Sequence, residues 1–397
     1  MTIGLGRIRD IFTKLSGLLA IGTANIVSSA ITGIFWFYMA GVMGPENYGN
    51  VSYFLSIAAV GSVLTILGTD NAVAVNINKN EKILAPLFFI VIVSTLVAAI
   101  VLYLIFSNIG VSLYVIGYGT FILVTMELLA RKIYKKYSKY VIAQRILLVV
   151  LGISLYHFIG PEGVILGYAL SLFPFSINIY KEFKRSKIDI SILKPHFGFM
   201  MSSYALSLSR TFSYSVDKLI ISPLFGFTLL GNYQLGMQAL TVLSLLPLTV
   251  FQYVLPHDAT GNPNRGIKIA TVIITILLSS LIILLSPIVL PSLFPKFVHA
   301  IEIVQIMSFA IIPITVNSML VSRLLGNQKI KVVTIGSAIT LFVQISGIVI
   351  LGKIYGINGA AASLVLGSSL EMIYLIIMSR TIFKESDNHH LPTNENK

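Results

Sequence analysis

The sequence contains no cysteine, a single tryptophan and only six histidines. Without cysteine the chain has no disulfide framework, no thiolate metal centre and no cysteine nucleophile. The histidines show no ligand spacing such as His-x-x-x-His, and neither a Walker A motif nor a Gly-x-Ser-x-Gly motif occurs. The sequence therefore predicts a protein that is not an enzyme, with no catalytic residue, no cofactor and no metal site.

Charged side chains are also scarce, at 11% of 397 residues. A soluble domain carries about 25%, whereas hydrophobic residues here reach 56% and the mean hydropathy is +0.89. A chain this poor in charge could not cover its own surface in water, which argues against a soluble enzyme and a disordered chain. The net charge of +13 does not indicate a nucleic-acid partner, because basic residues of membrane proteins collect in cytoplasmic loops.

Apolar runs long enough to cross a lipid bilayer as helices recur along the whole chain. They predict an all-α polytopic membrane protein. The twelve predicted spans cover 18–43, 48–77, 83–106, 110–131, 140–159, 162–181, 197–223, 228–255, 267–293, 299–325, 331–353 and 357–383.

The distribution of lysine and arginine gives the predicted orientation. With the N-terminus in the cytoplasm, most of the 28 basic residues fall in inside segments, and only Lys296 and Lys353 fall in outside loops. This alternation requires an even number of spans. We therefore expect a multi-pass protein of the cell membrane with both termini in the cytoplasm.

Two turn motifs recur at equivalent places in the predicted order of spans. Gly-x-x-x-x-Gly-Asn occurs at 44–50 and again at 226–232, and Gly-x-x-Gly occurs at 160–163 and at 356–359. Because six spans separate the copies, the two halves insert with the same orientation. This predicts two six-helix lobes related by a parallel pseudo-twofold repeat, with a site between them.

The repeat defines the expected domain organisation. It consists of an amphipathic N-terminal segment (1–17), an N-lobe with spans 1 to 6 (18–182), a basic cytoplasmic linker (183–196), a C-lobe with spans 7 to 12 (197–383) and a polar cytoplasmic tail (384–397).

Polar residues within the spans mark the candidate site. In span 7 they are spaced three and four apart, so they share one face of a helix. A shift of 182 residues places a second polar stripe on span 1, and polar residues also match between spans 2 and 8. The candidate cavity residues are Asn25, Ser28, Thr32, Ser207, Arg210, Tyr214, Gln234 and Gln238.

Arg210 is the most informative of these residues because it lies near the middle of span 7. An arginine at that depth costs about 2.5–3.5 kcal/mol on insertion scales and normally faces protein, water or an anion. One interpretation is contact with a phosphate of the substrate, which the guanidinium matches in geometry. The other is a structural ion pair with Asp70 or Glu371.

Four further ionisable residues are candidates for gating or for binding a coupling ion: Asp70, Asp217, Lys218 and Glu371. For Asp217 and Lys218 the alternative is a local ion pair at the membrane interface. Asp70 and Arg145 lie near inner ends of spans, where an interfacial position explains their charge. Glu371 is in the middle of span 12, where it could bind a proton or Na⁺, or pair with a cation.

The chain resembles the multidrug/oligosaccharidyl-lipid/polysaccharide (MOP) exporter superfamily, most of all its polysaccharide-transporter branch, which includes O-antigen flippases. The motifs that carry the resemblance lie after span 1, at the end of span 2, at the end of span 7 and at the start of span 12. They are Met43–Gly49, Leu67–Ala72, Val216–Ile220 and Tyr355–Ala361.

The resemblance implies a membrane transporter with two lobes and alternating access. Members of this branch flip polyprenyl-pyrophosphate-linked oligosaccharides from the inner to the outer leaflet for surface polysaccharide assembly, often with ion coupling. It also implies a glycan polymerase or glycosyltransferases as candidate partners, beside the lipid-linked glycan and the bilayer. The chain departs from the family in having one basic residue clearly in mid-membrane, and it lacks two additional helices of the lipid II flippases.

Two alternatives remain open on the sequence. One is a cation-coupled small-molecule or multidrug antiporter of the same superfamily, which would use Asp217 or Glu371. The other is a non-transporting subunit of a glycan export complex.

Overall fold

The computed structural model describes residues 2–76, 83–176, 188–260 and 264–389, apart from the side chains of residues 2–20, 76, 206, 210, 213, 214 and 383–389. Throughout this part of the chain the regular structure is helical, and no strand occurs in it.

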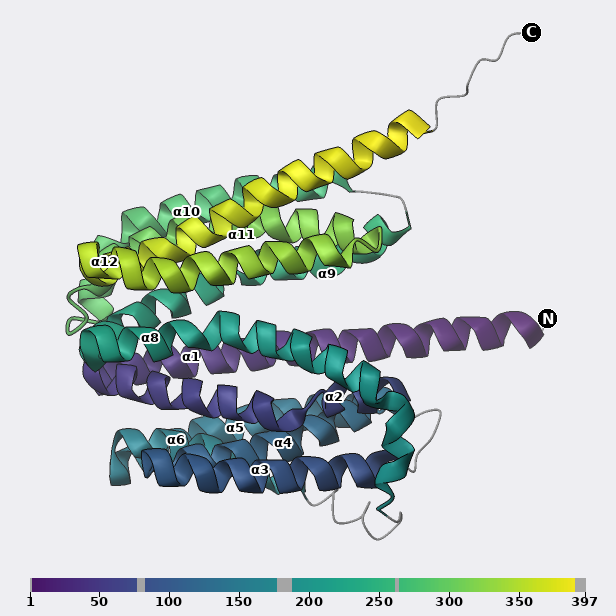
Figure 1. Ribbon diagram of the computed structural model, residues 1–397, viewed down its shortest axis with the longest axis horizontal. Coiled ribbons are helices and arrows are strands. Elements are labelled where there is room, and N and C mark those ends of the chain that lie inside the picture. Colours follow the sequence, from purple (N-terminus) through teal and green to yellow (C-terminus); the bar gives the residue numbers. More distant parts are fainter. Residues whose placement is uncertain (1, 77–82, 177–187, 261–263, 390–397) are drawn as a thin grey trace. The chain divides into compact units, whose positions relative to one another are not determined.

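The first half of the chain comprises a series of helices, several of them long enough to cross a membrane (Figure 1). They are α1 (Thr2–Ile66), α2 (Thr69–Asn76), α3 (Leu84–Phe106), α4 (Ile109–Ala130), α5 (Tyr134–Ile159), α6 (Pro161–Leu172) and the 3₁₀ helix η2 (Phe173–Ser176).

The second half repeats this plan with fewer breaks (Figure 1). It contains the 3₁₀ helix η3 (Ile190–His196), α8 (Phe197–Leu243), α9 (Leu245–Ala259), α10 (Arg265–Leu293), α11 (Ala300–Gly326) and α12 (Ile330–His389).

The predicted spans correspond to helical segments, but three predicted loops of three or four residues are reduced to one non-helical residue each. α1, α8 and α12 each continue through a predicted outer turn and are broken only at Gly44, Gly226 and Gly356. A glycine accepts the positive φ that reverses the helix direction, so a single residue suffices as the turn. The sequence analysis placed longer loops at these points.

The backbone torsions confirm the internal repeat. Gly44 (φ 73°, ψ 174°) and Gly226 (φ 80°, ψ 172°) adopt the same conformation. Gly160 (φ 70°, ψ −149°) and Gly356 (φ 61°, ψ −146°) share a second one. Each pair holds equivalent positions in the two copies of a turn motif.

A third repeated turn was not identified from the sequence. Lys132 and Gln328, 196 residues apart like Gly160 and Gly356, both have φ near 60°. In the first turn the N–H of Ile133 donates to the carbonyl of Leu128. In the second turn the N–H of Lys329 donates to the carbonyl of Leu324. The two copies have different side chains, so the backbone alone reveals this equivalence.

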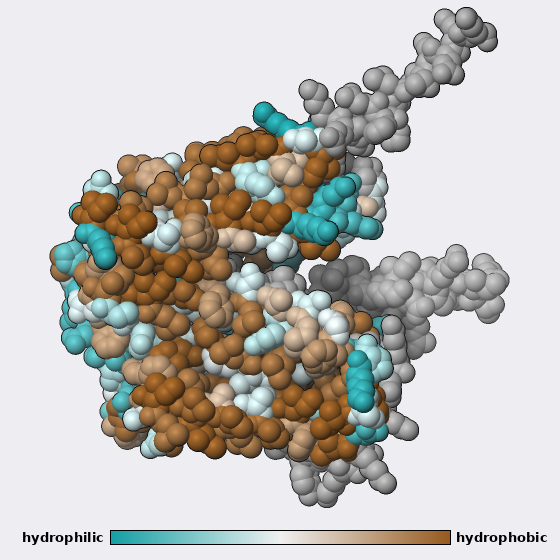
Figure 2. Space-filling model, in the orientation of Figure 1, coloured by the Kyte–Doolittle hydropathy of each residue, from teal (hydrophilic) through white to brown (hydrophobic). Residues whose placement is uncertain are grey.

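Apolar side chains cover most of the face shown in Figure 2, and hydrophilic residues gather toward the helix ends. Eight helices of the described residues are long and apolar enough to cross a membrane, and three of them have 45 to 53 residues. α3 and α10 bury only 22% and 17% of their most apolar windows. Such surfaces require a lipid environment, so the chain is a multi-pass membrane protein.

The chain divides into two compact units. The first comprises residues 1–43 and 50–219, and the second comprises 44–49 and 220–397. The core of the first unit joins α2, α3 and α4 to η3 and to the first turn of α8, through residues such as Val73, Phe88, Leu123, Leu193 and Met200. The predicted boundaries of the lobes, linker and tail stay a prediction.

Only residues 188–196 of the predicted linker are described. There Asp189 caps η3, because its carboxylate accepts hydrogen bonds from the hydroxyl (2.6 Å) and the backbone N–H (3.0 Å) of Ser191. These two bonds lower the pKa of Asp189. η3 leads directly into α8.

Candidate functional site

A close backbone approach in the first unit positions the first candidate site. Leu67 and Gly68 have positive φ, which ends α1 and starts α2 in a new direction. A Cβ on Gly68 would overlap the carbonyl oxygen of Met200 in α8. Only glycine fits this approach, and it places the start of α2 against α8.

A cavity of about 140 Å³ lies at this junction. Its polar lining includes Asp70 from α2, Tyr118 from α4, and Ser207 and Thr211 from α8. The structure therefore brings together two predicted site residues, Asp70 and Ser207, that stand 137 positions apart in the sequence.

Asp70 is partly buried beside this cavity. Its carboxylate meets the backbone N–H groups of Asp70 itself and of Asn71, while its Oδ1 is buried with no hydrogen-bond partner among the described residues. A buried oxygen acceptor beside a cavity has the chemistry to bind a proton or a small cation.

A row of tyrosines connects this cavity to Arg145. The Nη1 of Arg145 donates to the hydroxyl of Tyr168 at 2.7 Å, and Tyr168 packs edge-on against Tyr114. Tyr114 stacks on Tyr118, which lines the cavity. The guanidinium of Arg145 thus lies against an aromatic ring, and its interfacial position stays a prediction.

A second polar cluster surrounds Glu371 in the second unit. Its carboxylate accepts hydrogen bonds from Thr340 Oγ1 (2.7 Å) and from Asn317 Nδ2 (3.2 Å). Asn317 also donates to the carbonyl of Ser368, and its own Oδ1 is buried without a partner among the described residues. The described contacts of Glu371 are thus to neutral groups, which leaves its charge available to a proton or a cation.

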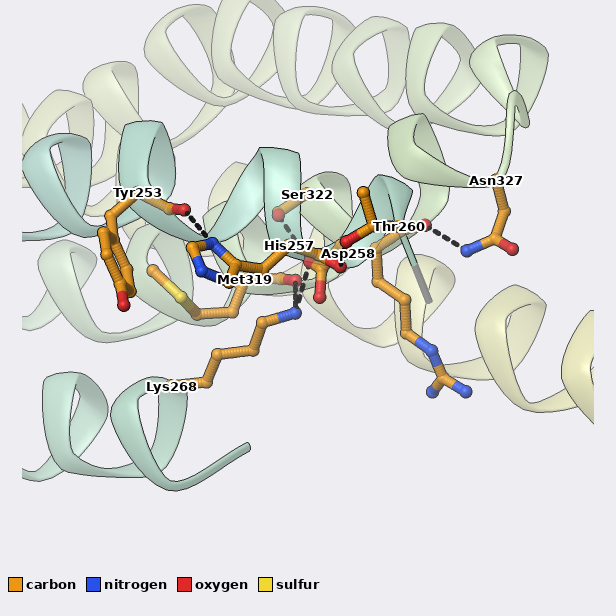
Figure 3. A network of polar contacts seen from close by, with 9 residues as sticks. Tyr253, His257, Asp258, Thr260, Lys268, Met319, Ser322 and Asn327 are labelled. Carbon is orange, nitrogen blue, oxygen red and sulfur yellow. Dashed lines mark hydrogen bonds and ion pairs between the residues drawn. The ribbon is translucent and has the colours of Figure 1, made fainter. Parts of the chain in front are cut away.

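The second unit holds a further ion pair that the sequence analysis missed (Figure 3). The buried carboxylate of Asp258 in α9 accepts from Lys268 of α10 and from Ser322 of α11, each at 2.5 Å. Lys268 also donates to the carbonyl of Met319 at 3.4 Å. The only local sign of this ion pair in the sequence is an acidic residue at the inner end of span 8. Its partners could not be identified from the sequence because they lie on other helices.

The predicted polar stripe on span 1 includes both exposed and buried residues. Asn25 is exposed and Ser28 is buried. The hydroxyl of Thr32 donates to the carbonyl of Ser28 at 2.7 Å, within the same helix.

The predicted residues of span 8 lie inside the second unit. Gln238 is buried, and the half-buried Gln234 lies beside the phenol of Tyr48. The predicted cavity between the lobes stays a prediction.

The remaining candidates belong to span 7. Asp217 and Lys218 are both buried and form an ion pair with 3.2 Å between Nζ and Oδ1. The side chains of Arg210 and Tyr214 lie outside the described residues. Among the residues that are described, no cluster of three or more His, Cys, Asp or Glu side chains could hold a metal ion.

Comparison with known structures identifies the fold. The chain is similar to the lipid II flippase MurJ (TM-score 0.66, 15% identity, covering 92% of this chain and 87% of that one). It is equally similar to an inward-facing multidrug resistance MATE family transporter of the MOP superfamily (TM-score 0.66, 13% identity, 92% and 96%). A eukaryotic MATE transporter matches with a TM-score of 0.57, 16% identity and coverage of 92% and 95%. No protein-family model matches the chain, and no characterised protein matches it in sequence.

These matches define the fold. The chain shares the helical fold of MurJ and of a MATE transporter of the MOP superfamily, which confirms the predicted fold class and agrees with the resemblance drawn from its turn motifs.

Proposed function

We propose that the protein flips a polyprenyl-(pyro)phosphate-linked oligosaccharide from the inner to the outer leaflet of the cell membrane, by alternating access. The observation that supports the proposal is the fold, shared over 92% of the chain with the lipid II flippase MurJ. In this proposal both termini lie in the cytoplasm, and a glycan polymerase or glycosyltransferases act on the same lipid-linked glycan.

Arg210 is the proposed phosphate contact. It stands in α8 three positions after Ser207 and one before Thr211, the two α8 residues that line the cavity of the first unit. Asn25, Ser28, Thr32, Tyr214, Gln234 and Gln238 are the proposed polar lining for the sugar. A polar sugar needs such hydroxyl and amide partners to replace the water that it leaves.

The proposal is tested by measuring lipid-linked oligosaccharide on each leaflet in a deletion strain. We expect the substrate to accumulate on the inner leaflet, and we expect wild type to restore its export while a well-expressed Arg210→Ala variant does not. Rescue by both proteins would retain the flippase but remove Arg210 from its site. An unchanged distribution in the deletion strain would contradict the proposal.

A cation-coupled antiporter is the second candidate, because the described contacts of Glu371 and Asp70 show carboxyl oxygens next to neutral groups or to a cavity. Such carboxylates suit coupling by H⁺ or Na⁺ in either kind of transporter. An antiporter would export lipophilic cations from energised cells, and Glu371→Gln would abolish that export. Efflux of a fluorescent cation with normal glycan export would favour this candidate.

A further inference from the structure

An amphiphilic cavity opens on the second unit between α10 and α11, next to the ion pair of Asp258 and Lys268. Its volume is about 330 Å³. Apolar side chains form most of its lining, and three basic residues complete it. The lining residues are Arg265, Lys268, Ile269, Val272, Ile273, Val316, Met319, Leu320 and Arg323.

The basic residues gather at one end of the two helices. Arg265 is the first residue of α10 and Arg323 lies in the last turn of α11. Lys268 is held in place by Asp258 and by the carbonyl of Met319, as Figure 3 shows. None of the lining residues is acidic. Asp258 pairs with Lys268 from outside the cavity, and the lining itself is basic and apolar.

An exposed apolar stripe continues from this basic end along α10. Ile269, Ile273 and Leu277 are 60%, 53% and 64% exposed, and they are spaced four residues apart on one helix face. In a membrane protein such a face lies against acyl chains. The cavity thus joins a cationic rim at the helix ends to a hydrocarbon-facing groove.

The first repeat offers an internal comparison. A shift of 196 residues, which relates Lys132 to Gln328, places Glu127 at the position of Arg323. Glu127 pairs with Arg131 of its own helix at 2.9 Å. The equivalent helix end of the first repeat therefore carries an acid, so an arginine is not a requirement of the turn itself.

We propose that this cavity binds an anionic phospholipid of the leaflet at that end of the helices, which is the inner leaflet in the proposed orientation. Its phosphate lies between Arg265 and Arg323, and one acyl chain follows the groove of Ile269, Ile273 and Val316. Charge and shape both favour this occupant, since basic pockets between membrane helices match acidic head groups. The site is independent of the transported substrate.

The test uses the full chain purified in a neutral detergent, with retention of dioleoyl phosphatidylglycerol compared with dioleoyl phosphatidylcholine by native mass spectrometry. We expect wild type to prefer phosphatidylglycerol, and Arg265→Gln with Arg323→Gln to lower its affinity about tenfold or more. Lys331→Gln with Arg380→Gln is the matched control, since it removes the same charge from exposed positions of α12. An equal loss in the control pair would overturn the proposal.

Two further measurements distinguish a lipid site from a simple anion site. Ile273→Trp fills the groove at an exposed position and should reduce phosphatidylglycerol binding without changing the charge. Inorganic phosphate at millimolar concentration should not displace the lipid. Displacement by phosphate, together with full binding by Ile273→Trp, would make the site a simple anion site and contradict a lipid. Because Arg265 is exposed, Arg265→Gln alone reports on binding even if the double variant folds poorly.

Discussion

Asp70 and Asp258 show how neighbouring groups decide what a buried carboxylate does. Asp258 has a lysine and a serine hydroxyl as partners, and it joins three helices. Each carboxylate keeps a buried Oδ1 without a partner among the described residues, but only Asp70 lines the cavity beside it. Lys268 compensates the charge of Asp258, whereas the described contacts of Asp70 are to backbone N–H groups, which suits a proton or cation that comes and goes.

Asp70→Asn should raise the melting temperature of the purified protein or leave it unchanged. The isosteric amide removes a charge whose buried, unpartnered oxygen costs about 1–3 kcal/mol. Thermal unfolding in detergent, followed by tryptophan fluorescence or by loss of the monomer peak, measures this. A clear decrease would show that Asp70 has a structural partner and would remove it from the candidate site.

Asp258→Asn or Lys268→Met should act in the opposite direction. Each single change leaves the other group charged in a mostly buried position, which costs about 3–5 kcal/mol for a buried pair. The double variant should recover much of that loss. A double-mutant cycle on unfolding temperature is the measurement, and strictly additive losses would show that the two groups do not interact.

At the scale of helices, the sequence predicted the spans because their apolar runs and turn glycines are local signals. It also predicted the repeat, since Gly44 and Gly226 stand in the same motif. It did not predict that a single glycine could make the whole turn, or that Gly68 touches Met200. That contact joins residues far apart in the sequence, and no local pattern records it.

The repeat has a reciprocal contact that depends on two glycines. A Cβ on Gly49 would overlap the carbonyl oxygen of Phe227, and one on Gly231 would overlap that of Pro45. The same shift of 182 residues relates Pro45 to Phe227 and Gly49 to Gly231. The backbones of the two copies therefore meet through equivalent atoms within the second unit.

Gly231→Ala should destabilise the protein by about 1–3 kcal/mol, the usual cost of forcing extra atoms into a packed site. Gly22→Ala is the control, because a Cβ at Gly22 meets nothing within 4 Å and alanine is the better helix former. Thermal unfolding of the two variants compares them. Equal stability would show that the helices separate at Gly231 without cost.

At the scale of the whole molecule, the absence of cysteine makes the orientation directly testable. Single cysteines at Lys296 and at Gln328 should react from opposite sides of the membrane with an impermeant maleimide. In intact cells Lys296→Cys should be labelled and Gln328→Cys should not, until the cells are opened. The reverse pattern would invert the proposed orientation and move the anionic lipid to the outer leaflet.

The candidate site was only partly accessible from the sequence. Polarity within apolar spans identified Asp70, Ser207 and Glu371, because such residues stand out against their surroundings. Arg145 was interpreted as interfacial and its tyrosine neighbours were not identified, since tyrosines in membrane helices usually serve as packing or interfacial residues. Their common function depends on helices that the chain brings together only on folding.

Transport by the purified protein tests the central proposal most directly. The protein is reconstituted into liposomes that carry a polyprenyl-pyrophosphate oligosaccharide, and the fraction open to an external glycosidase is followed with time. We expect wild type to make the protected half of the substrate accessible to the external glycosidase, and we expect Arg210→Ala to do so far more slowly. A protein that leaves this substrate protected but moves a fluorescent cation across the same bilayer would contradict the proposal.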